Sequence, residues 1–241
     1  MVETIRSRYA EVCDKVNTLS NNRDWQKGII RIIVVTKRQP IEACQEVIDA
    51  GATNIGENYV EEANEKYNTG ISYKVNFHMI GHLQSRKSKL LDPLFSFMHT
   101  IDRFEIAKKV SKLYEEKEKC LKVLLEVNFT EELSKSGFRM NNDYEKKVFL
   151  NNFDTIRNLP GISICGLMTM GHFPSTPERN REIFRKCRIL LEEINNKYSL
   201  NEFKELSMGT SGDYPTAIQE GATFVRIGEL IMGRRMEISR L

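Results

Sequence analysis

Ile29-Ile30-Arg31-Ile32-Ile33-Val34-Val35-Thr36 is an apolar run rich in β-branched residues, and Lys37 follows it directly. Such runs favour buried β-strands, because branched side chains pack well on a pleated surface. A lysine at the end of a buried strand is costly unless its amine is used, since burial disfavours the ammonium form and makes the free amine more available as a nucleophile. Lys37 is therefore a candidate for a Schiff base with a carbonyl-bearing ligand.

The same alternation of a short apolar run and a longer amphipathic stretch continues along the whole chain. Strands are predicted at 29–36, 54–56, 76–81, 97–101, 121–127, 163–168, 205–208 and 223–227. Helical segments are predicted at 2–19, 41–50, 60–67, 84–91, 103–117, 143–158, 177–198, 214–221 and 230–233, with Asp102 and Asp213 as capping residues and a polar loop at 128–142.

Eight strands, each followed by a helical segment, predict a parallel sheet that closes on itself. We therefore predict an α/β fold, a (β/α)₈ TIM barrel with an additional N-terminal helix, in a single domain that covers residues 1–241. A doubly wound open sheet is the alternative, because it uses the same alternating units.

The composition is that of an ordinary globular protein, with 241 residues, 40% hydrophobic and 29% charged residues and a formal net charge of +3. So small a charge gives no case for binding nucleic acid or a membrane surface. No apolar run approaches the roughly 20 residues that span a bilayer, and we expect no signal peptide at the N-terminus. The five cysteines form no C-x-x-C pair and the four histidines lack zinc spacing, so we expect reduced thiols, a cytoplasmic location and no metal site.

The carboxyl ends of the strands carry the active site in barrels of this kind, and phosphate sites often follow strands seven and eight. After strand seven, Ser207-Met208-Gly209-Thr210-Ser211-Gly212 offers hydroxyls and small residues, whose backbone N–H groups can approach an anion closely. After strand eight, Gly228 and Glu229 open a helical turn with further N–H groups, and Glu229 would contribute only its backbone. Tight turns alone are the plainer explanation of these glycines.

Arg226 lies between Val225 and Ile227 on the last predicted strand. It could line the barrel in an ion pair with a carboxylate, or it could face the ring nitrogen or the phosphate of a pyridoxal cofactor. Because arginine stays protonated, it can donate a hydrogen bond to that nitrogen but cannot help to protonate it. A site of this kind should hold the cofactor well and drive carbanion chemistry poorly.

Together these segments resemble the pyridoxal phosphate homeostasis protein family (the YggS/PROSC family), in order and over nearly the whole chain. The matching stretches include Val34-Val35-Thr36-Lys37, Ile55-Gly56-Glu57-Asn58-Tyr59, His78-Met79-Ile80-Gly81-His82, Glu126-Val127-Asn128, Gly166-Leu167-Met168-Thr169-Met170, Ser207-Met208-Gly209 and Val225-Arg226-Ile227-Gly228.

The resemblance implies a barrel similar to the N-terminal domain of alanine racemase, with pyridoxal 5'-phosphate held as an internal aldimine on Lys37. It further implies that Arg226 faces the pyridine nitrogen and that Asn58 lies near the ring. The residues implied around the phosphate are Ser207, Ser211, Gly228 and Glu229. One departure is Gln39, which stands where the family commonly has a second lysine.

The resemblance implies a carrier that takes part in vitamin B6 homeostasis, a monomer that could deliver the cofactor to apo-enzymes. A small pyridoxal phosphate-dependent amino-acid racemase is the alternative, although a racemase needs a further β-domain and a tyrosine base, for which we expect no room after the eighth βα unit. A barrel that binds sugar phosphates, with Lys37 paired to an acid, is a third possibility. Basic stretches such as Arg86-Lys87-Ser88-Lys89 are expected to be solvated helix faces.

Overall fold

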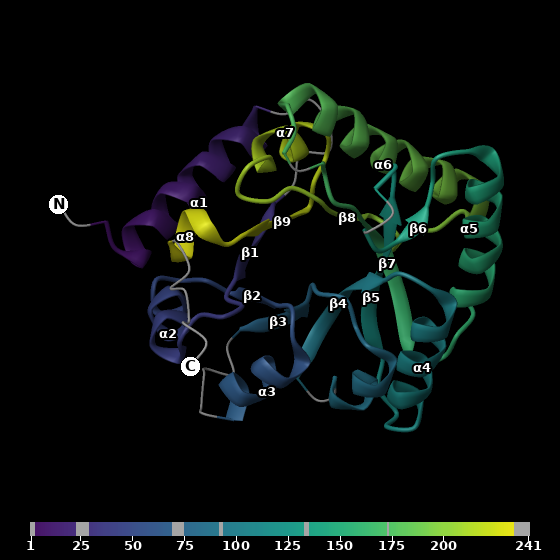
Figure 1. Cartoon of the computed structure of the whole chain (residues 1–241), viewed down its shortest axis with the longest axis horizontal. Helices are drawn as coiled ribbons and strands as arrows, with labels where there is room; N and C mark the ends of the chain where they lie inside the picture. Colours follow the sequence, from purple (N-terminus) through teal and green to yellow (C-terminus); the bar gives the residue numbers. More distant parts are fainter. Residues whose placement is uncertain are drawn as a thin grey trace.

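Eight parallel strands pair in a closed ring, with helices on the outside (Figure 1). The structure, a computed structural model, describes residues 3–22, 29–68, 75–91, 94–132, 135–172 and 174–233. The strands are β1 (Arg31–Val35), β2 (Asn54–Glu57), β3 (Asn76–Met79), β4 (Phe95–Ile101), β5 (Leu121–Asn128), β6 (Phe138–Arg139), β7 (Ile162–Met168), β8 (Glu205–Ser207) and β9 (Phe224–Ile227). The two-residue strand β6 pairs with β5 and is not part of the ring of eight.

The helices cover the outside of this ring. They are α1 (Ile5–Asn21), α2 (Ile41–Asp49), α3 (Val60–Asn68), the 3₁₀ turn η1 (Ser85–Leu90), α4 (Phe104–Glu115), α5 (Asp143–Ile156), α6 (Pro177–Tyr198), α7 (Tyr214–Gln219) and α8 (Glu229–Met232). The extra N-terminal helix α1 packs against α8, α7 and α2 (Figure 1).

The barrel closes because the first strand, β1, pairs with the last, β9, and because β4 pairs with β5. β1 pairs with β2 and also with β9, in a register that sets Arg31 opposite Phe224 and Val34 opposite Ile227. β4 pairs with β5, which joins the two halves of the sheet. The (β/α)₈ barrel with an additional N-terminal helix is therefore confirmed, and the open sheet is excluded.

Several local predictions were wrong. The first helix begins at Ile5, not at residue 2, because Thr4 and Ser7 form a reciprocal capping box there. Residue 2 itself lies outside the described residues. The polar loop at 128–142 contains the two-residue strand β6, which pairs with the end of β5. The segment after Gln84 forms a 3₁₀ turn in place of an α-helix.

The two predicted aspartate caps also differ from the structure. The helix after β4 has Arg103 at its N-cap, and the Asp102 carboxylate bonds to Arg103 (2.5 Å) and pairs with His82 (2.7 Å). Asp213 does stand at the N-cap of α7, but its carboxylate accepts from the backbone and the hydroxyl of Thr210 (2.6 and 2.9 Å). Both carboxylates therefore hold loops at the carboxyl end of the barrel.

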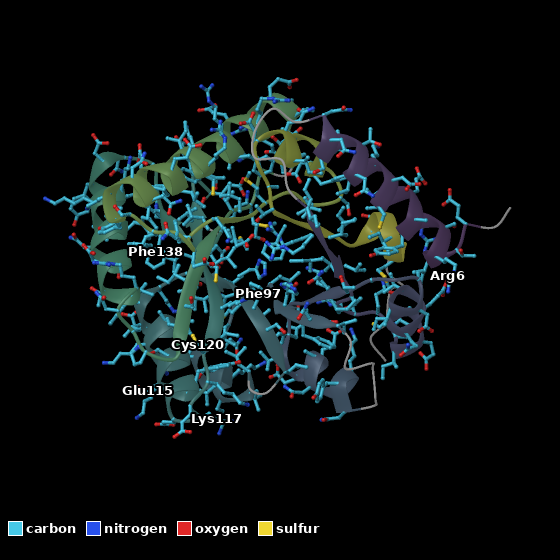
Figure 2. The ribbon with its side chains drawn as sticks, turned by 180° about the vertical axis from the view of Figure 1, so that it is seen from behind. Arg6, Phe97, Glu115, Lys117, Cys120 and Phe138 are labelled. Atoms are coloured by element: carbon cyan, nitrogen blue, oxygen red, sulfur yellow. The ribbon has the colours of Figure 1, made fainter. Side chains whose placement is uncertain are left out.

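The amino-terminal half of the barrel interior is filled by aromatic side chains. Phe97, labelled near the middle of Figure 2, stacks on His78 with ring centroids 5.0 Å apart, and it meets Phe224 edge-on at 5.5 Å. The Arg31 guanidinium lies 3.7 Å from the centroid of the Phe224 ring. The interior is thus a packed core rather than a channel.

All five cysteines are free thiols; Cys44, Cys165 and Cys187 are buried, and Cys120 is exposed. Within the described ranges, no helix is both long and apolar enough to cross a membrane. The described residues also contain no cluster of His, Cys, Asp and Glu side chains that could hold a metal ion.

Candidate cofactor site

A cavity of about 550 Å³ opens at the carboxyl ends of the strands, where barrels of this kind carry their sites. Six of the seven predicted site residues line this cavity: Lys37, Asn58, Ser211, Arg226, Gly228 and Glu229. They follow or end β1, β2, β8 and β9, so four separate segments of the chain converge on one space. The structure therefore brings these six residues together on one cavity, as expected for strand ends in a barrel.

Lys37 lies in a tight turn after β1 rather than at the end of the strand. The strand ends at Val35, and the turn is closed by a hydrogen bond from the Gln39 N–H to the Thr36 carbonyl (3.0 Å). The Lys37 side chain is half-buried and lines the cavity. It is thus less deeply buried than the sequence suggested, and the turn now determines where its amine points.

Arg226 is almost completely buried at the floor of the cavity, with 4% of its surface exposed. Its guanidinium donates to the Ser207 hydroxyl (2.7 Å), to the Thr169 carbonyl (3.0 Å) and to the Met170 sulfur (2.9 Å). Among the described residues no carboxylate forms an ion pair with it. Burial lowers the pKa of Arg226 to about 10, and Asp213 and Glu126 oppose that shift, so the group remains a cation at neutral pH.

Ser207 does not line the cavity, and its predicted place beside a phosphate is not where the structure puts it. It is fully buried below Arg226, because it points into the barrel from β8. Its hydroxyl accepts from Arg226 and lies 2.8 Å from Nδ1 of His99. We therefore reassign Ser207 as a support for Arg226.

A chain of hydrogen bonds continues from Ser207 through the barrel interior. His99 Nε2 lies 2.9 Å from His78 Nδ1, and His78 Nε2 lies 3.0 Å from the Asn54 amide oxygen. Burial lowers the pKa of His78 to about 3, and burial and the neighbouring His78 lower the pKa of His99 well below its usual value. Both rings are therefore neutral, with one N–H each.

Because both imidazole rings are neutral, the direction of every hydrogen bond in this chain is determined. The Asn54 oxygen only accepts, so His78 donates from Nε2 and accepts at Nδ1. His99 must then donate from Nε2 and accept at Nδ1 from the Ser207 hydroxyl, which in turn accepts from Arg226. In a chain whose hydrogen bonds all run in one direction, no side chain can rotate without leaving its neighbour without a partner. The chain therefore fixes the Arg226 guanidinium from the side of the barrel interior.

The two loops after β8 and β9 are tied to each other at the edge of the cavity. The Gly228 N–H donates to the Ser211 hydroxyl (3.3 Å). Gly209 has φ +90°, and a Cβ there would lie 2.6 Å from the Ala217 side chain, so only glycine lets this loop pack on α7. These contacts hold small residues and backbone groups of both loops against one wall.

A second cavity of about 240 Å³ adjoins the first and shares Asn58, Ile80 and Met170 with it. Glu126, on β5, lines this second cavity and is 7% exposed. Its carboxyl accepts no hydrogen bond from any described residue. Burial raises the pKa of Glu126 to about 7; the Asp102 carboxylate adds to the rise and Arg226 opposes it. The site therefore contains a carboxyl that changes charge near neutral pH.

The sequence placed Glu126 and His78 within strand-end stretches but gave no individual role to them, to His99 or to Lys66 on α3. Glu126, His78 and His99 lie on predicted strands, where every second side chain faces the same side. That alternation could have indicated that these three side chains point into the barrel. Lys66 bonds to the Thr36 carbonyl (2.7 Å) and pairs with Glu57 (2.7 Å). Only its spacing of four from Glu62 was visible in the sequence.

The donor set determines which ligand the larger cavity suits. Lys37 supplies an amine that can condense with an aldehyde, and Arg226 supplies a fixed cationic donor on the same cavity. The loops at 210–212 and 228–230 supply hydroxyl and backbone groups of the kind that surround phosphates. A compact ring with an aldehyde, a hydrogen-bond acceptor and a phosphate fits these groups, and pyridoxal 5'-phosphate has all three.

Comparison with known proteins agrees with this arrangement. Residues 18–236 match the model of the family "Alanine racemase, N-terminal domain". The chain is 33% identical over 223 residues to the pyridoxal phosphate homeostasis protein of Haemophilus influenzae, covering 92% of each chain. PipY of Synechococcus elongatus, solved with pyridoxal phosphate bound, superposes with a TM-score of 0.81 and 26% identity, over 95% of this chain and 100% of PipY.

Alanine racemase of Clostridium difficile shares the fold, with a TM-score of 0.70 and 12% identity, and this chain covers 93% of its own length but 55% of the racemase. The match with the racemase is thus one of fold alone, whereas the match with the homeostasis protein of Haemophilus influenzae covers 92% of both sequences. This chain belongs to the pyridoxal phosphate homeostasis protein family, within the larger family of alanine racemase N-terminal domains.

Proposed function

We propose that this protein binds pyridoxal 5'-phosphate in the 550 Å³ cavity, as a reversible Schiff base on Lys37, and serves intracellular vitamin B6 homeostasis as one barrel domain. The observation that carries the proposal is the convergence of Lys37 and Arg226 on one cavity. The relatives named for this role, and PipY with pyridoxal phosphate bound, support it.

The other cavity residues have distinct roles in this proposal. Ser211 and the backbone at Gly228 and Glu229 surround the phosphate, while the Glu229 carboxylate points elsewhere because it would repel the anion. Asn58 lies beside the ring. Ser207 acts only through Arg226, as its hydrogen bond indicates.

We further propose that the protein is a carrier rather than an enzyme. When bound, the cofactor supplies an aldehyde that captures amines and a ring that can accept electrons from a carbanion. Arg226 donates a hydrogen bond to the ring nitrogen but cannot help to protonate it, so the ring remains a poor electron sink. The alternative, a small amino-acid racemase, shares the fold of the alanine racemase N-terminal domain and needs a direct test.

Borohydride reduction followed by peptide mass spectrometry tests the bond to Lys37. Treatment of the loaded protein should leave one pyridoxyl adduct, on the peptide that contains Lys37. Lys37→Ala should lose both the adduct and the visible absorbance, whereas Lys108→Ala, which removes an exposed lysine on α4, should keep both. An adduct on another lysine would overturn the assignment, and a sugar-phosphate barrel would give no adduct.

Proton exchange in deuterated water separates carrier from enzyme. The loaded protein is incubated with a panel of amino acids, and mass spectrometry follows deuterium at the α-carbon. We expect no exchange above the rate of free pyridoxal phosphate. Exchange at enzymatic rates that disappears in Lys37→Ala would establish the racemase alternative instead.

The proposal also includes a location and recipients. Five free thiols fit a reducing compartment such as the cytoplasm. The recipients would be apo-enzymes that depend on pyridoxal phosphate. Transfer from the loaded protein should restore activity to such an apo-enzyme even when a trap removes free cofactor; complete inhibition by the trap would limit the role to buffering.

A further inference from the structure

The turn that carries Lys37 has an unfavourable backbone conformation. Arg38, the residue after Lys37, has φ +58°, a left-handed conformation that costs free energy for residues with a side chain. Glycine or asparagine would be the usual choice at this place in a turn. The hydrogen bond from Gln39 to Thr36 closes the turn but reaches neither Lys37 nor Arg38. Something else must therefore hold this conformation.

A buried cluster of charges bonds to both residues that flank Lys37. The Lys66 ammonium donates to the Thr36 carbonyl (2.7 Å), and the Thr36 hydroxyl donates to the Glu57 carboxylate (2.6 Å). The Arg38 N–H donates to the Glu62 carboxylate (2.5 Å). Lys66 joins the two carboxylates, with 2.7 Å to each. The cluster therefore forms hydrogen bonds with Thr36, immediately before Lys37, and with Arg38, immediately after it.

The cost of this cluster indicates a role other than stability. Lys66 is 4% exposed and Glu57 is fully buried. Well-packed apolar residues often stabilise a protein as much as a buried ion pair does, because desolvation offsets the attraction between the charges. Burial lowers the pKa of Lys66, but the nearby Glu57 and Cys44 and the hydrogen bonds to Glu57 and Glu62 together outweigh burial, so the pKa is raised and the ammonium persists. What the charges provide is directional bonds to a strained turn.

We propose that Lys66, Glu57 and Glu62 are positioning residues for Lys37: they fix Thr36 and Arg38 so that the Lys37 amine faces the cavity for condensation with an aldehyde. None of the three lines that cavity, so they act through the backbone of the turn. The inference rests on the proposed function. It adds that imine formation, as distinct from binding of ring and phosphate, depends on this cluster.

Two ligands separate these contributions. Pyridoxal 5'-phosphate binds through ring, phosphate and imine, whereas pyridoxamine 5'-phosphate has the same ring and phosphate but no aldehyde. The change in the ratio of the two dissociation constants between wild type and a variant therefore reports the effect of the variant on imine formation. The variants are Glu62→Gln, Lys66→Met and Lys66→Arg. The matched control is Glu61→Gln, which alters the neighbouring glutamate on α3, exposed and paired with Lys87.

Glu62→Gln and Lys66→Met should weaken pyridoxal phosphate binding about tenfold relative to pyridoxamine phosphate binding, the usual effect of losing a hydrogen bond to a charged group. Lys66→Arg should recover part of this loss, and Glu61→Gln should match wild type. If Lys66→Met does not fold, Glu62→Gln decides the matter, since Glu62 is partly exposed.

An unchanged ratio in the folded variants would overturn the inference, and so would equal losses for both ligands, which would mean general damage to the cavity. Failure of the proposed function has a different appearance: wild-type protein itself would then show no reducible adduct on Lys37.

Discussion

Glu126 is the described carboxyl whose ionisation should matter most near neutral pH. Its side chain is buried, lines the second cavity and accepts no hydrogen bond from the described residues. Burial raises its pKa from 4.5 to about 7. Between pH 4.5 and about 7 the folded protein keeps a proton on Glu126 that the unfolded chain has released. The free energy of unfolding contributed by this carboxyl is therefore fully present below pH 4.5 and is lost as the pH rises through about 7.

Glu126→Gln should remove that pH dependence, because glutamine has the same shape and no charge. Its free energy of unfolding relative to wild type should rise from pH 4.5 to above pH 7, by on the order of 3 kcal/mol for the shift of pKa from 4.5 to about 7. Urea titrations at several pH values measure this difference, in which the effects of His78 and His99 cancel. Glu42→Gln, on the exposed face of α2, is the control, and an equally flat difference for Glu126→Gln would refute the raised pKa.

At the scale of elements, the short helix α8 depends on α1 for support. The helix has four residues, and Gly228, Glu229 and Leu230 at its start line the cavity. From α1 the Arg8 guanidinium donates to the Ile231 carbonyl (2.7 Å), near the opposite end of α8. The two helices lie side by side in Figure 1. The additional N-terminal helix is thus connected to the proposed phosphate site.

Arg8→Ala should therefore lower the free energy of unfolding by about 1–3 kcal/mol, since it leaves a carbonyl without its charged donor. It should also weaken binding of pyridoxamine 5'-phosphate severalfold, because α8 loses its outer contact. Arg6→Ala is the control: Arg6, labelled at the edge of Figure 2, is exposed, and among the described residues it bonds only to the Asp49 carbonyl (3.3 Å), at the end of α2. Chemical denaturation measures the free energy of unfolding, and calorimetry measures the affinity for pyridoxamine 5'-phosphate. Equal affinities in the two variants would show that α1 does not influence ligand binding.

At the scale of the whole molecule, the fold could be predicted from the sequence because its information is periodic. Alternating apolar runs and amphipathic stretches are local patterns, and closure follows once there are eight of them. The local errors were of another kind. Asp102 was predicted as a helix cap, but its carboxylate instead pairs with the adjacent Arg103 and with His82, which the fold brings close.

The site was predictable to the extent that strand ends meet in a barrel. This rule and the family resemblance placed Lys37, Asn58, Arg226 and their neighbours on one cavity. They could not show that Ser207 points inward, since a residue at a strand end can face either the rim or the interior. Nor could they reveal Lys66 below the Lys37 turn, because that contact depends on how α3 packs on the barrel.

The closed sheet leads to a prediction about assembly. The β4–β5 pairing gives each barrel strand a neighbour on both sides, so no barrel edge remains to pair with a second chain. Exposed large apolar side chains of the described residues are spread over several elements, and Tyr144 on α5 is 76% exposed. Two of them, Met170 and Leu230, line the cavity, and Tyr59 directly follows the cavity residue Asn58.

We therefore expect a monomer of 28.0 kDa with and without pyridoxal phosphate. Sedimentation equilibrium at increasing protein concentration should return this mass throughout, because stable dimers bury large apolar patches, whereas the exposed large apolar side chains of the described residues are spread over several elements. Tyr144→Ser removes the most exposed aromatic side chain among the described residues and should leave the mass unchanged. A mass that rises with concentration in wild type, and falls back in Tyr144→Ser, would instead identify α5 as an interface between copies of the chain.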